Sequence, residues 1–515
     1  MTRTLLLCVT ILFAALSASA QDASDVVIPI PQQPFARAVP DFVGAPAVPN
    51  PIHAEAIPED PFMAPNGESG VHLDAYQSDT YTIPGPLGHS PEVTSTFLAA
   101  LCGTVTFDAQ RRIVVVCVNV RPVLYLLDPV SLAILTRFPL PFAQSNGEFG
   151  AGGYFFLDNK DRAVIPTRTN DIWRIKEVNG SSGTTFVTDH TCSENLPSAI
   201  PSGEEILSTF PDAHGLLWFT TSGVSGSLNT HPAMVGTANP DPTDMNACAI
   251  KLYTLPSGEA IHKSFAVDPD RSRGGVFIVS DHQLYRFDAA PDGTPAVTWH
   301  EAYDRGTETK PGQRNQGSGT TPTLMGTKFV TIADNAEPRM NVNVYLRAPT
   351  VNRPRLVCSE PVFQPGTSDT FNSLIATGRS ISVENNYGYT GPQDTIFGGT
   401  TTPGVTRIDL GGDGDSCHTV WNNDQESAPN VVSQMSLATG LEYTYTKDPS
   451  PSDAPQTDPW YFTAIDFHTG QTIYKVLAGT GVLYNSNYSS VYVGPDGKTA
   501  YVGVLGGLVR IHDTY

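Results

Sequence analysis

Short runs of apolar residues, separated by turns, recur along the chain from about residue 78 to the C-terminus. Each unit contains a strand, a turn that often holds Asp and Gly, a second strand, a gap and a third strand. Short apolar runs bounded by turn residues are typical of strands. The pattern therefore predicts repeated all-β units. The units begin near Thr104, Gly153, Ser208, Phe265, Pro322, Asn372, Val432 and Ser490.

Eight units between residues 78 and 515 average about 55 residues, the size of four-stranded blades with loop insertions. We predict an all-β fold, an eight-bladed β-propeller over residues 78–515, with seven blades plus a decorated one as the alternative. The last unit has room for only three strands. We expect an N-terminal strand within Ser78–Ile83 to supply the fourth and to close the ring.

The first 77 residues have a different composition. Met1–Ala20 combines Arg3, an apolar run and an Ala-Ser-Ala cleavage site, which is the pattern of a secretory signal peptide. The protein is therefore expected to be secreted, or periplasmic in a Gram-negative host. Residues 21–77 hold ten prolines between Pro29 and Pro65, which favours extended chain. This leader is either disordered or wrapped around the folded domain.

The six cysteines after the signal peptide indicate disulfides in an exported protein, since no zinc-binding spacing occurs. Six cysteines allow 15 connectivities. The strand layout favours Cys102 with Cys117 across one hairpin, and neighbours along the chain for the rest, Cys192 with Cys248 and Cys358 with Cys417. Asn179 and Asn487 begin glycosylation sequons, so a eukaryotic host could produce a glycoprotein.

Charge and composition limit the classes of partner that the protein is expected to bind. The net charge of −21 argues against nucleic acid and anionic membrane surfaces, and nothing after the signal peptide is apolar enough for membrane insertion. Only 16% of residues are charged, which argues against helical bundles. Sequence motifs of serine hydrolases, zinc proteases, ATPases and NAD(P) enzymes do not occur. The remaining partners are a small molecule, a glycan or a protein.

In a propeller, the loops between second and third strands meet the loops that enter the innermost strands on one face, where function concentrates. Three loops on this face carry insertions, Ser222–Ala247, Tyr387–Gly404 and Asp448–Pro459, and suggest a walled pocket. The densest polar cluster follows two strands and consists of Asp334, Asn335, Glu384, Asn385 and Asn386.

Carboxylate and amide oxygens are ligands suited to Ca²⁺, so Asp334, Asn335, Glu384 and Asn385 are the candidate metal ligands. Asn and Asp also favour turns and strand ends for backbone reasons, which is the alternative. His262 and His282 are candidates for a general base.

Asp281, Tyr387 and Tyr389 are candidates for ligand binding. The tyrosines could stack on a sugar or an aromatic ring, although tyrosine in strands is also ordinary sheet packing.

Two local resemblances bear on function. The segment Ala464-Ile-Asp-Phe-His-Thr-Gly-Gln-Thr-Ile-Tyr474 resembles the repeat of quinoprotein-like propellers, which implies a propeller fold. An adjacent Cys-Cys pair, which often covers the cofactor in pyrroloquinoline-quinone dehydrogenases, is absent, and Tyr474 stands where the repeat has Trp, which argues against that cofactor. The segment Phe210–Thr221 resembles a strand pair of lactonase-type and streptogramin-lyase-type propellers, which implies a central Ca²⁺ held by Glu, Asn and Asp.

Three functions follow from these observations. The first is a secreted binding scaffold that holds a small molecule, glycan or protein on its loop-elaborated face. The alternative is a Ca²⁺-dependent enzyme of lactonase or lyase type, and a quinone-dependent dehydrogenase is third. The sequence leaves open whether the protein is an enzyme.

Overall fold

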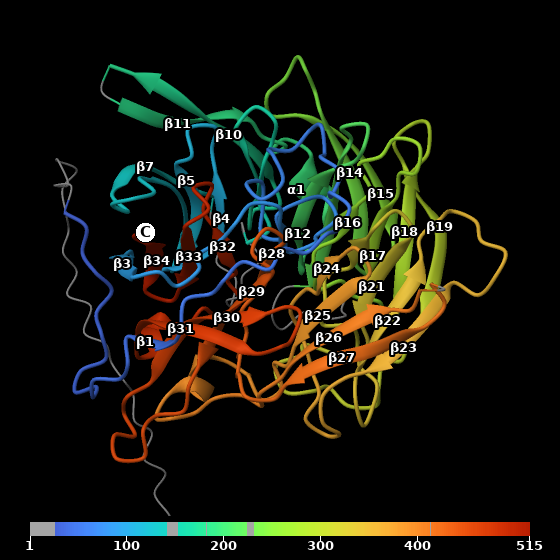
Figure 1. Cartoon of the computed structure of the whole chain (residues 1–515). Coiled ribbons are helices and arrows are strands. Elements are labelled where there is room, and N and C mark those ends of the chain that lie inside the picture. The colour runs from blue at the N-terminus through green and yellow to red at the C-terminus, as the bar shows by residue number, and fades with distance from the viewer. Residues whose placement is uncertain (1–25, 142–152, 182, 224–230, 413) are drawn as a thin grey trace, which may run out of the picture.

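The computed structural model describes residues 26–141, 153–181, 183–223, 231–412 and 414–515. The predicted signal peptide, residues 1–20, lies outside this part. The described residues form eight sheets arranged around a centre (Figure 1). Seven sheets have four strands, and one has six because two short N-terminal strands join it. The eight-bladed propeller is therefore confirmed.

The first strand of each blade is innermost, and consecutive strands pair antiparallel outward. Blades 1 to 4 consist of β4 (Leu101–Phe107), β5 (Ile113–Val118), β6 (Pro122–Leu127) and β7 (Ile134–Pro139); β8 (Phe156–Leu157), β9 (Ala163–Pro166), β10 (Ile172–Gly180) and β11 (Gly183–His190); β12 (Glu204–Pro211), β13 (Leu217–Gly223), β14 (Met234–Pro240) and β15 (Cys248–Thr254); and β16 (Ala266–Val267), β17 (Val276–Val279), β18 (Gln283–Ala289) and β19 (Pro295–Ala302).

Blades 5 to 8 follow the same order. They consist of β20 (Thr323–Met325), β21 (Phe329–Ala333), β22 (Asn341–Leu346) and β23 (Leu356–Pro361); β24 (Ile375–Thr377), β25 (Ser380–Glu384), β26 (Val405–Leu410) and β27 (Cys417–Asn423); β28 (Gln434–Ser436), β29 (Leu441–Lys447), β30 (Pro459–Asp466) and β31 (Thr472–Thr480); and β32 (Val491–Val493), β33 (Thr499–Val504), β34 (Gly507–Asp513) and β3 (Pro91–Phe97). Single turns of helix occur at α1 (Leu196–Ala199), η1 (Pro392–Thr395) and η2 (Val482–Tyr484).

The ring is closed by an N-terminal strand, as predicted, but the predicted residues are wrong. Strand β3 pairs antiparallel with β34 and is the outermost strand of blade 8. Part of the predicted segment, β2 (Thr80–Tyr81), lies instead on the inner side of blade 7, parallel to β28. The outer place in the blade suits β3, because three of its seven residues are exposed, whereas Thr80 and Tyr81 are fully buried.

The apolar core lies between neighbouring blades. Val114 and Leu126 of blade 1, for example, pack in one buried cluster with Ala163 and Ile165 of blade 2. Such interfaces follow from the continuous apolar runs seen in the sequence, since each sheet buries both faces against its neighbours.

The leader packs against the propeller throughout residues 26–77. Strand β1 (Phe42–Gly44) extends the outer edge of blade 7 by pairing with β31. The amide of Asn50 donates to Thr439 O at 2.9 Å, and that of Ile52 donates to Leu437 O at 2.8 Å. The proline content allowed either a disordered leader or a leader wrapped around the folded domain. The described part of the leader, from residue 26 onward, is wrapped around the propeller.

The leader then enters the centre of the ring, where residues 68–81 form what we call the plug. All of residues 69–81 are buried. Blade amides donate to plug carbonyls one after another, at 2.8–3.1 Å. These bonds run from Phe107 to Glu68, Leu157 to Ser69, Val267 to Ala75, Leu324 to Tyr76, Ala376 to Ser78, Met435 to Asp79 and Leu437 to Tyr81, and the amide of Val493 donates to the Tyr81 hydroxyl. The plug thus contacts seven of the eight blades and closes the central channel.

The three predicted disulfides are confirmed. Cys102 and Cys117 face each other across β4 and β5. Cys358 on β23 and Cys417 on β27 link the outermost strands of blades 5 and 6, and Cys192 joins Cys248. Three disulfides are consistent with an extracellular location. Within the described residues, no helix has the length and apolar character needed to cross a bilayer.

Candidate functional site

A pocket of about 640 Å³ lies at the centre of the ring, above the plug. Plug residues Val71 and His72 line it, together with residues of the loops that enter the innermost strands. This volume falls in the range of small-molecule sites. The other described residues that line it are Gly103, Thr104, Gly153, Tyr154, Glu205, Leu207, Ser222, His262, Lys263, Gly312, Gln313, Arg314, Asn315, Ser318, Thr321, Phe371, Asn372, Ser373, Thr390, Gly391, Pro392, Val432, Asn487 and Tyr488.

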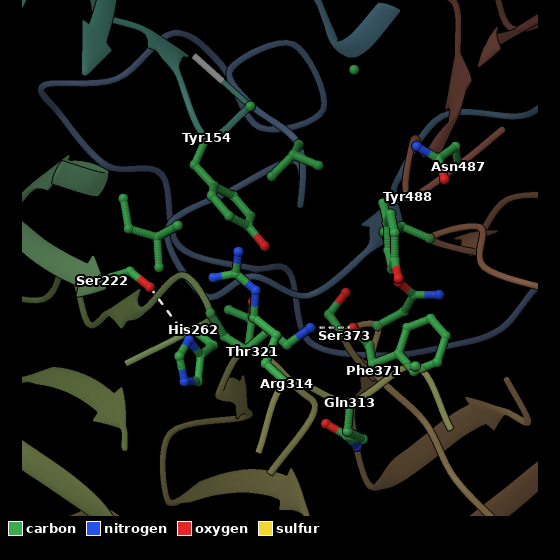
Figure 2. Close-up of a pocket in the computed structure, with 18 of the residues that line it drawn as sticks. Tyr154, Ser222, His262, Gln313, Arg314, Thr321, Phe371, Ser373, Asn487 and Tyr488 are labelled. Carbon is green, nitrogen blue, oxygen red and sulfur yellow. Dashed lines mark hydrogen bonds between the residues drawn. The ribbon is translucent and has the colours of Figure 1, made fainter. Parts of the chain in front are cut away.

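Aromatic rings form two sides of the pocket. Figure 2 shows Tyr154 on one side, and Phe371 and Tyr488 on another. The ring centroids of Phe371 and Tyr488 are 5.5 Å apart, and Tyr389 packs edge-on behind Tyr488 at 6.0 Å. These rings offer an apolar surface to a planar ligand.

The backbone that presents Tyr488 is strained. Asn487 and Tyr488 have φ values of 41° and 72°, in the left-handed region that side chains other than glycine rarely occupy. The Tyr488 amide donates to Asn430 O at 3.0 Å, and the Tyr389 hydroxyl donates to Asn487 Oδ1 at 2.8 Å. The surrounding structure therefore holds this ring against the pocket at an energetic cost, a feature that clusters at functional sites.

Two cationic side chains line the pocket, Lys263 and Arg314. Burial lowers the pKa of Lys263 to about 8, and the nearby Asp369 raises it again in part. The Lys263 Nζ donates to Phe371 O at 2.6 Å and lies 5.9 Å from the centre of the Phe371 ring. Burial also lowers the pKa of Arg314, but a guanidinium remains charged at any ordinary pH.

His262 is the one sequence-predicted site residue that lines the pocket. Its Nε2 lies 2.9 Å from Asn315 Nδ2, which also donates to Asp281 Oδ2 at 2.8 Å. Since an amide nitrogen only donates, Nε2 is the acceptor and Nδ1 carries the proton toward Ser222 Oγ, 3.3 Å away (Figure 2). Burial lowers the pKa of His262 to about 4. His262 is thus a neutral donor to Ser222, and both of its nitrogens are already engaged.

A second histidine, His72, lies at the pocket floor and was missed in the sequence. Its Nδ1 is 3.1 and 3.2 Å from the two oxygens of Asp79 and 2.9 Å from Ser373 Oγ. Ser373 also donates to Asp79, and Gln434 Nε2 donates to Asp79 at 2.8 Å. Serine and carboxylate therefore share the same histidine nitrogen, whereas a serine nucleophile and its orienting carboxylate occupy opposite nitrogens of the catalytic histidine. These hydrogen bonds attach the plug to blade 6 through Ser373 and to blade 7 through Gln434.

Three of the remaining predicted residues, Asp281, Tyr389 and Glu384, contact residues that line the pocket. Asp281 accepts a hydrogen bond from the pocket residue Asn315, and Tyr389 donates one to the pocket residue Asn487. Asn372, which lines the pocket, donates to Glu384 Oε1 at 2.8 Å and to Val431 O at 2.7 Å. These three residues position the lining instead of facing the cavity.

The four candidate metal ligands all take part in hydrogen bonds with their own or neighbouring segments of the protein, Glu384 with Asn372 and Ser433. Asp334 accepts from the amides of Ala336 and Asn341 and from the side chains of Asn341 and Asn343, at 2.6–3.2 Å. Asn335 donates to Arg305 O and Glu308 O, and Asn385 donates to Thr367 O. None of the four lines the pocket. This arrangement is the strand-end capping that the sequence left as an alternative, and calcium binding stays a prediction.

Among the residues that the structure describes, one set of three His, Cys, Asp or Glu side chains lies within metal-binding reach. It consists of His190, Cys192 and Cys248, and the two cysteines form a disulfide. The remaining predicted residues, His282 and Tyr387, do not line the pocket; His282 Nδ1 lies 2.8 Å from Asp281 Oδ1.

Glu384 leads to a prediction about pH. Burial raises its pKa from 4.5 to about 8, so the folded chain holds a proton that the unfolded chain releases. Its stabilising contribution is fully present below pH 4.5 and is lost as pH rises through about 8. Glu384→Gln retains the acceptor for Asn372 and places a donor toward Ser433. Relative to wild type, we expect the variant to gain at least about 1 kcal/mol of unfolding free energy between pH 5 and pH 8.

Urea unfolding at both pH values, with a chelator present, measures this difference. Repeating it with Ca²⁺ tests the metal prediction in the same samples, since a cation at Glu384 would make the variant less stable than wild type. A variant that loses stability at pH 8 with the chelator present would show that Glu384 is ionised in the folded chain.

The three predicted loop insertions contribute unequally to the lining of the pocket. Thr390, Gly391 and Pro392 of Tyr387–Gly404 line the pocket, as expected. The assignment of Ser222–Ala247 as one loop is wrong for Met234–Pro240, which is strand β14, and residues 224–230 lie outside the described part. Asp448–Pro459 lines no part of the pocket and instead contacts the leader: Asp458 accepts from Gln33 Nε2 at 3.3 Å.

Fold and site together define the class: an eight-bladed β-propeller whose channel is closed by its own N-terminal plug beneath a pocket of small-molecule size. No family model matches the chain. An uncharacterized protein of Archaeoglobus fulgidus is 25% identical over 338 residues, which cover 60% of this chain and 61% of that protein. The chain thus spans about three fifths of the length of this relative.

Solved structures with a similar fold include BamB from Moraxella catarrhalis, at 12% identity and a TM-score of 0.45, over 84% of this chain and 96% of that chain. The Dos1 propeller is 9% identical with a TM-score of 0.46, over 80% of this chain and 92% of that chain. Similarity at this level concerns the β-propeller fold alone, and the quinoprotein-like superfamily stays a prediction.

Proposed function

We propose that this chain is an exported small-molecule-binding protein whose ligand occupies the central pocket. The observation that carries the proposal is the pocket itself: about 640 Å³, floored by the plug and lined by loops of most blades. A pre-formed concave site with aromatic walls and a few polar groups is the usual form of a ligand site.

The two serine–histidine contacts support binding over nucleophilic hydrolysis. At both, the histidine nitrogen nearest the serine carries the proton, so neither histidine accepts the serine proton. Export is part of the proposal, supported by the signal-peptide pattern and by three disulfides.

Filling the pocket tests the proposal. Leu207, on β12, lines the cavity and is 7% exposed, whereas Leu135, on β7, is 45% exposed at the outer edge of blade 1. Leu207→Trp places a larger side chain into the cavity, and Leu135→Trp makes the same change at the outer edge. We expect small aromatic and alicyclic fragments, screened by ligand-observed NMR, to bind wild type and Leu135→Trp and to lose at least about ten-fold in affinity for Leu207→Trp.

Urea unfolding of both variants establishes that they are folded. Fragments that bind Leu207→Trp as tightly as wild type would place the binding site elsewhere and refute the proposal. A screen without any hit on wild type would do the same and would favour a protein or glycan partner on the loop face.

A further inference from the structure

We propose that Lys263 is a covalent attachment site for the ligand: its amine condenses with the carbonyl group of a small aromatic aldehyde to form an imine, and the ring of the aldehyde lies against Phe371 and Tyr488. This inference rests on the proposed function and goes beyond it, because it names the chemical class of the ligand and the bond that holds it.

The position of Lys263 is the first argument. It lies between β15 and β16, in the loop that enters the innermost strand of blade 4, and it lines the pocket. Its Nζ donates to Phe371 O at 2.6 Å, and among the described residues this carbonyl is the one acceptor of a hydrogen bond from it. A lysine nitrogen carries up to three donor hydrogens. The backbone carbonyl thus fixes the nitrogen at the cavity wall without neutralising its charge.

Two buried lysines elsewhere in the chain have the partners that a structural lysine needs. Lys447 Nζ lies 3.2 Å from Asp458 Oδ1, and Lys475 Nζ lies 2.9 Å from Glu426 Oε2. In the part of the chain that the structure describes, no carboxylate forms an ion pair with Lys263. A desolvated ammonium group without a paired anion is costly. The cost is lower for a neutral amine, and the neutral amine is the form that reacts with carbonyl compounds.

The protonation of Lys263 agrees with this reading. Burial lowers the pKa of Lys263 to about 8, although the nearby Asp369 raises it in part. At pH 7 about one tenth of such amines carry no proton, against about one in 2,500 of ordinary lysines. Desolvation of this kind is one way in which proteins make a lysine nucleophilic.

The condensation needs no reactant other than the aldehyde. The lone pair of the neutral Nζ forms a bond to the carbonyl carbon, and the oxygen takes up one proton as the nitrogen releases one. The resulting carbinolamine loses its hydroxyl group and the second amine hydrogen as water, which leaves a C=N double bond. Nothing is oxidised or reduced, and addition of water reverses the reaction, so that the attached ligand can be released.

The aromatic rings select the body of the aldehyde. Lys263 Nζ lies 5.9 Å from the centre of the Phe371 ring, whose centroid is 5.5 Å from that of Tyr488. Figure 2 shows both rings on the same side of the pocket. A flat ring packed against this pair keeps its carbonyl group close to the amine, and such positioning accelerates a reaction between bound groups. An aliphatic aldehyde has no ring with which to make this contact.

The test is reductive trapping of the full chain at pH 7 with 1-naphthaldehyde at substoichiometric concentration. Sodium cyanoborohydride reduces the imine to a stable secondary amine, and peptide mapping by mass spectrometry identifies the modified lysines. We expect Lys263 to be modified at least about ten-fold faster than Lys251, which is exposed and pairs with Asp292 on the outer surface.

Lys310 is the matched internal control. It is buried, donates to Ala336 O at 3.1 Å and has a pKa that burial lowers, but it does not line the pocket. If the cavity is what brings the aldehyde to the amine, Lys310 should stay unmodified in the same sample.

Two further measurements link the reaction to the pocket. Leu207→Trp should slow the modification of Lys263 at least about ten-fold, whereas Leu135→Trp should leave it unchanged. The alcohol 1-naphthalenemethanol has the same ring and cannot form an imine. It should slow the modification of Lys263 in wild type without affecting Lys251.

Three outcomes overturn the inference: modification of Lys263 no faster than that of Lys251, equal modification of Lys310, or a rate that Leu207→Trp leaves unchanged. If fragments bind wild type and are lost in Leu207→Trp while Lys263 stays unmodified, the covalent site is wrong and the proposed function stands. If no fragment depends on Leu207, the proposed function itself has failed.

Discussion

Replacing Asp79 with alanine is expected to lower the free energy of unfolding by about 4 kcal/mol, because it removes the acceptor on which the plug depends. Asp79 is fully buried. It accepts from His72 Nδ1, from Gln434 Nε2 and from Ser373 Oγ. Alanine would leave these three donors buried without their partner, and each such donor costs about 1–3 kcal/mol.

The residue also has a backbone role. Its φ of 55° lies in the left-handed region, which Asn tolerates better than Ala. Asp79→Asn, which retains one acceptor oxygen and the backbone conformation, should therefore lose less stability than Asp79→Ala. Asp292→Ala, at an exposed turn, should stay within about 1 kcal/mol of wild type.

Urea unfolding measures the stability, and amide hydrogen exchange locates the change. We expect exchange to rise first at the buried amides of residues 69–81 and at the blade amides that donate to their carbonyls. A loss below about 1 kcal/mol, or faster exchange spread evenly over the blades, would show that the plug does not need this network.

The blades were predictable because their strands are short apolar runs separated by turn residues. Third strands such as β6, β18 and β34 repeat an apolar pattern at nearly constant spacing. The disulfides followed from the same layout, since Cys102 and Cys117 fall at matched positions of one hairpin. Local pairing between consecutive strands is information that the sequence carries directly.

The plug could not be predicted in this way. Its residues are mostly polar, and they are buried through backbone hydrogen bonds to six separate blades and through the Tyr81 hydroxyl to a seventh. No local periodicity marks a segment whose hydrogen-bond partners in the blades are 39 to 412 residues away. The misassigned ring-closing strand has the same cause, because Ser78–Ile83 resembles a strand although only Thr80–Tyr81 pairs, and it pairs inside the channel.

Three of the predicted site residues lie behind the lining of the pocket and do not face its cavity. Asp281, Glu384 and Tyr389 end strands or follow them, so a repeat-based analysis finds them, but they hold Asn315, Asn372 and Asn487 at the wall. The lining cation Lys263 comes from a loop outside the repeat. Only its place next to His262, in a loop that enters an innermost strand, could have indicated it.

Replacing Lys447 with methionine is expected to lower the free energy of unfolding by about 3–5 kcal/mol, because it leaves a buried carboxylate without its cation. Lys447 Nζ lies 3.2 Å from Asp458 Oδ1, and both side chains are 0% exposed. Asp458 also accepts from the amides of Phe397 and Gly398 and from Gln33 of the leader. The pair therefore joins the leader to the inserted loop that forms one pocket wall.

The double variant Lys447→Met with Asp458→Asn should lose less stability than the sum of the single variants, since each single variant leaves a lone buried charge and the double variant leaves none. Arg37→Ala is the control, because Arg37 pairs with Asp453 in the same region but the two side chains are 55% and 68% exposed, so the loss should stay within about 1 kcal/mol. Denaturant unfolding of the four variants gives the coupling energy. Losses that simply add would mean that the leader is held by its other contacts, including β1 on β31, and that this ion pair adds nothing to them.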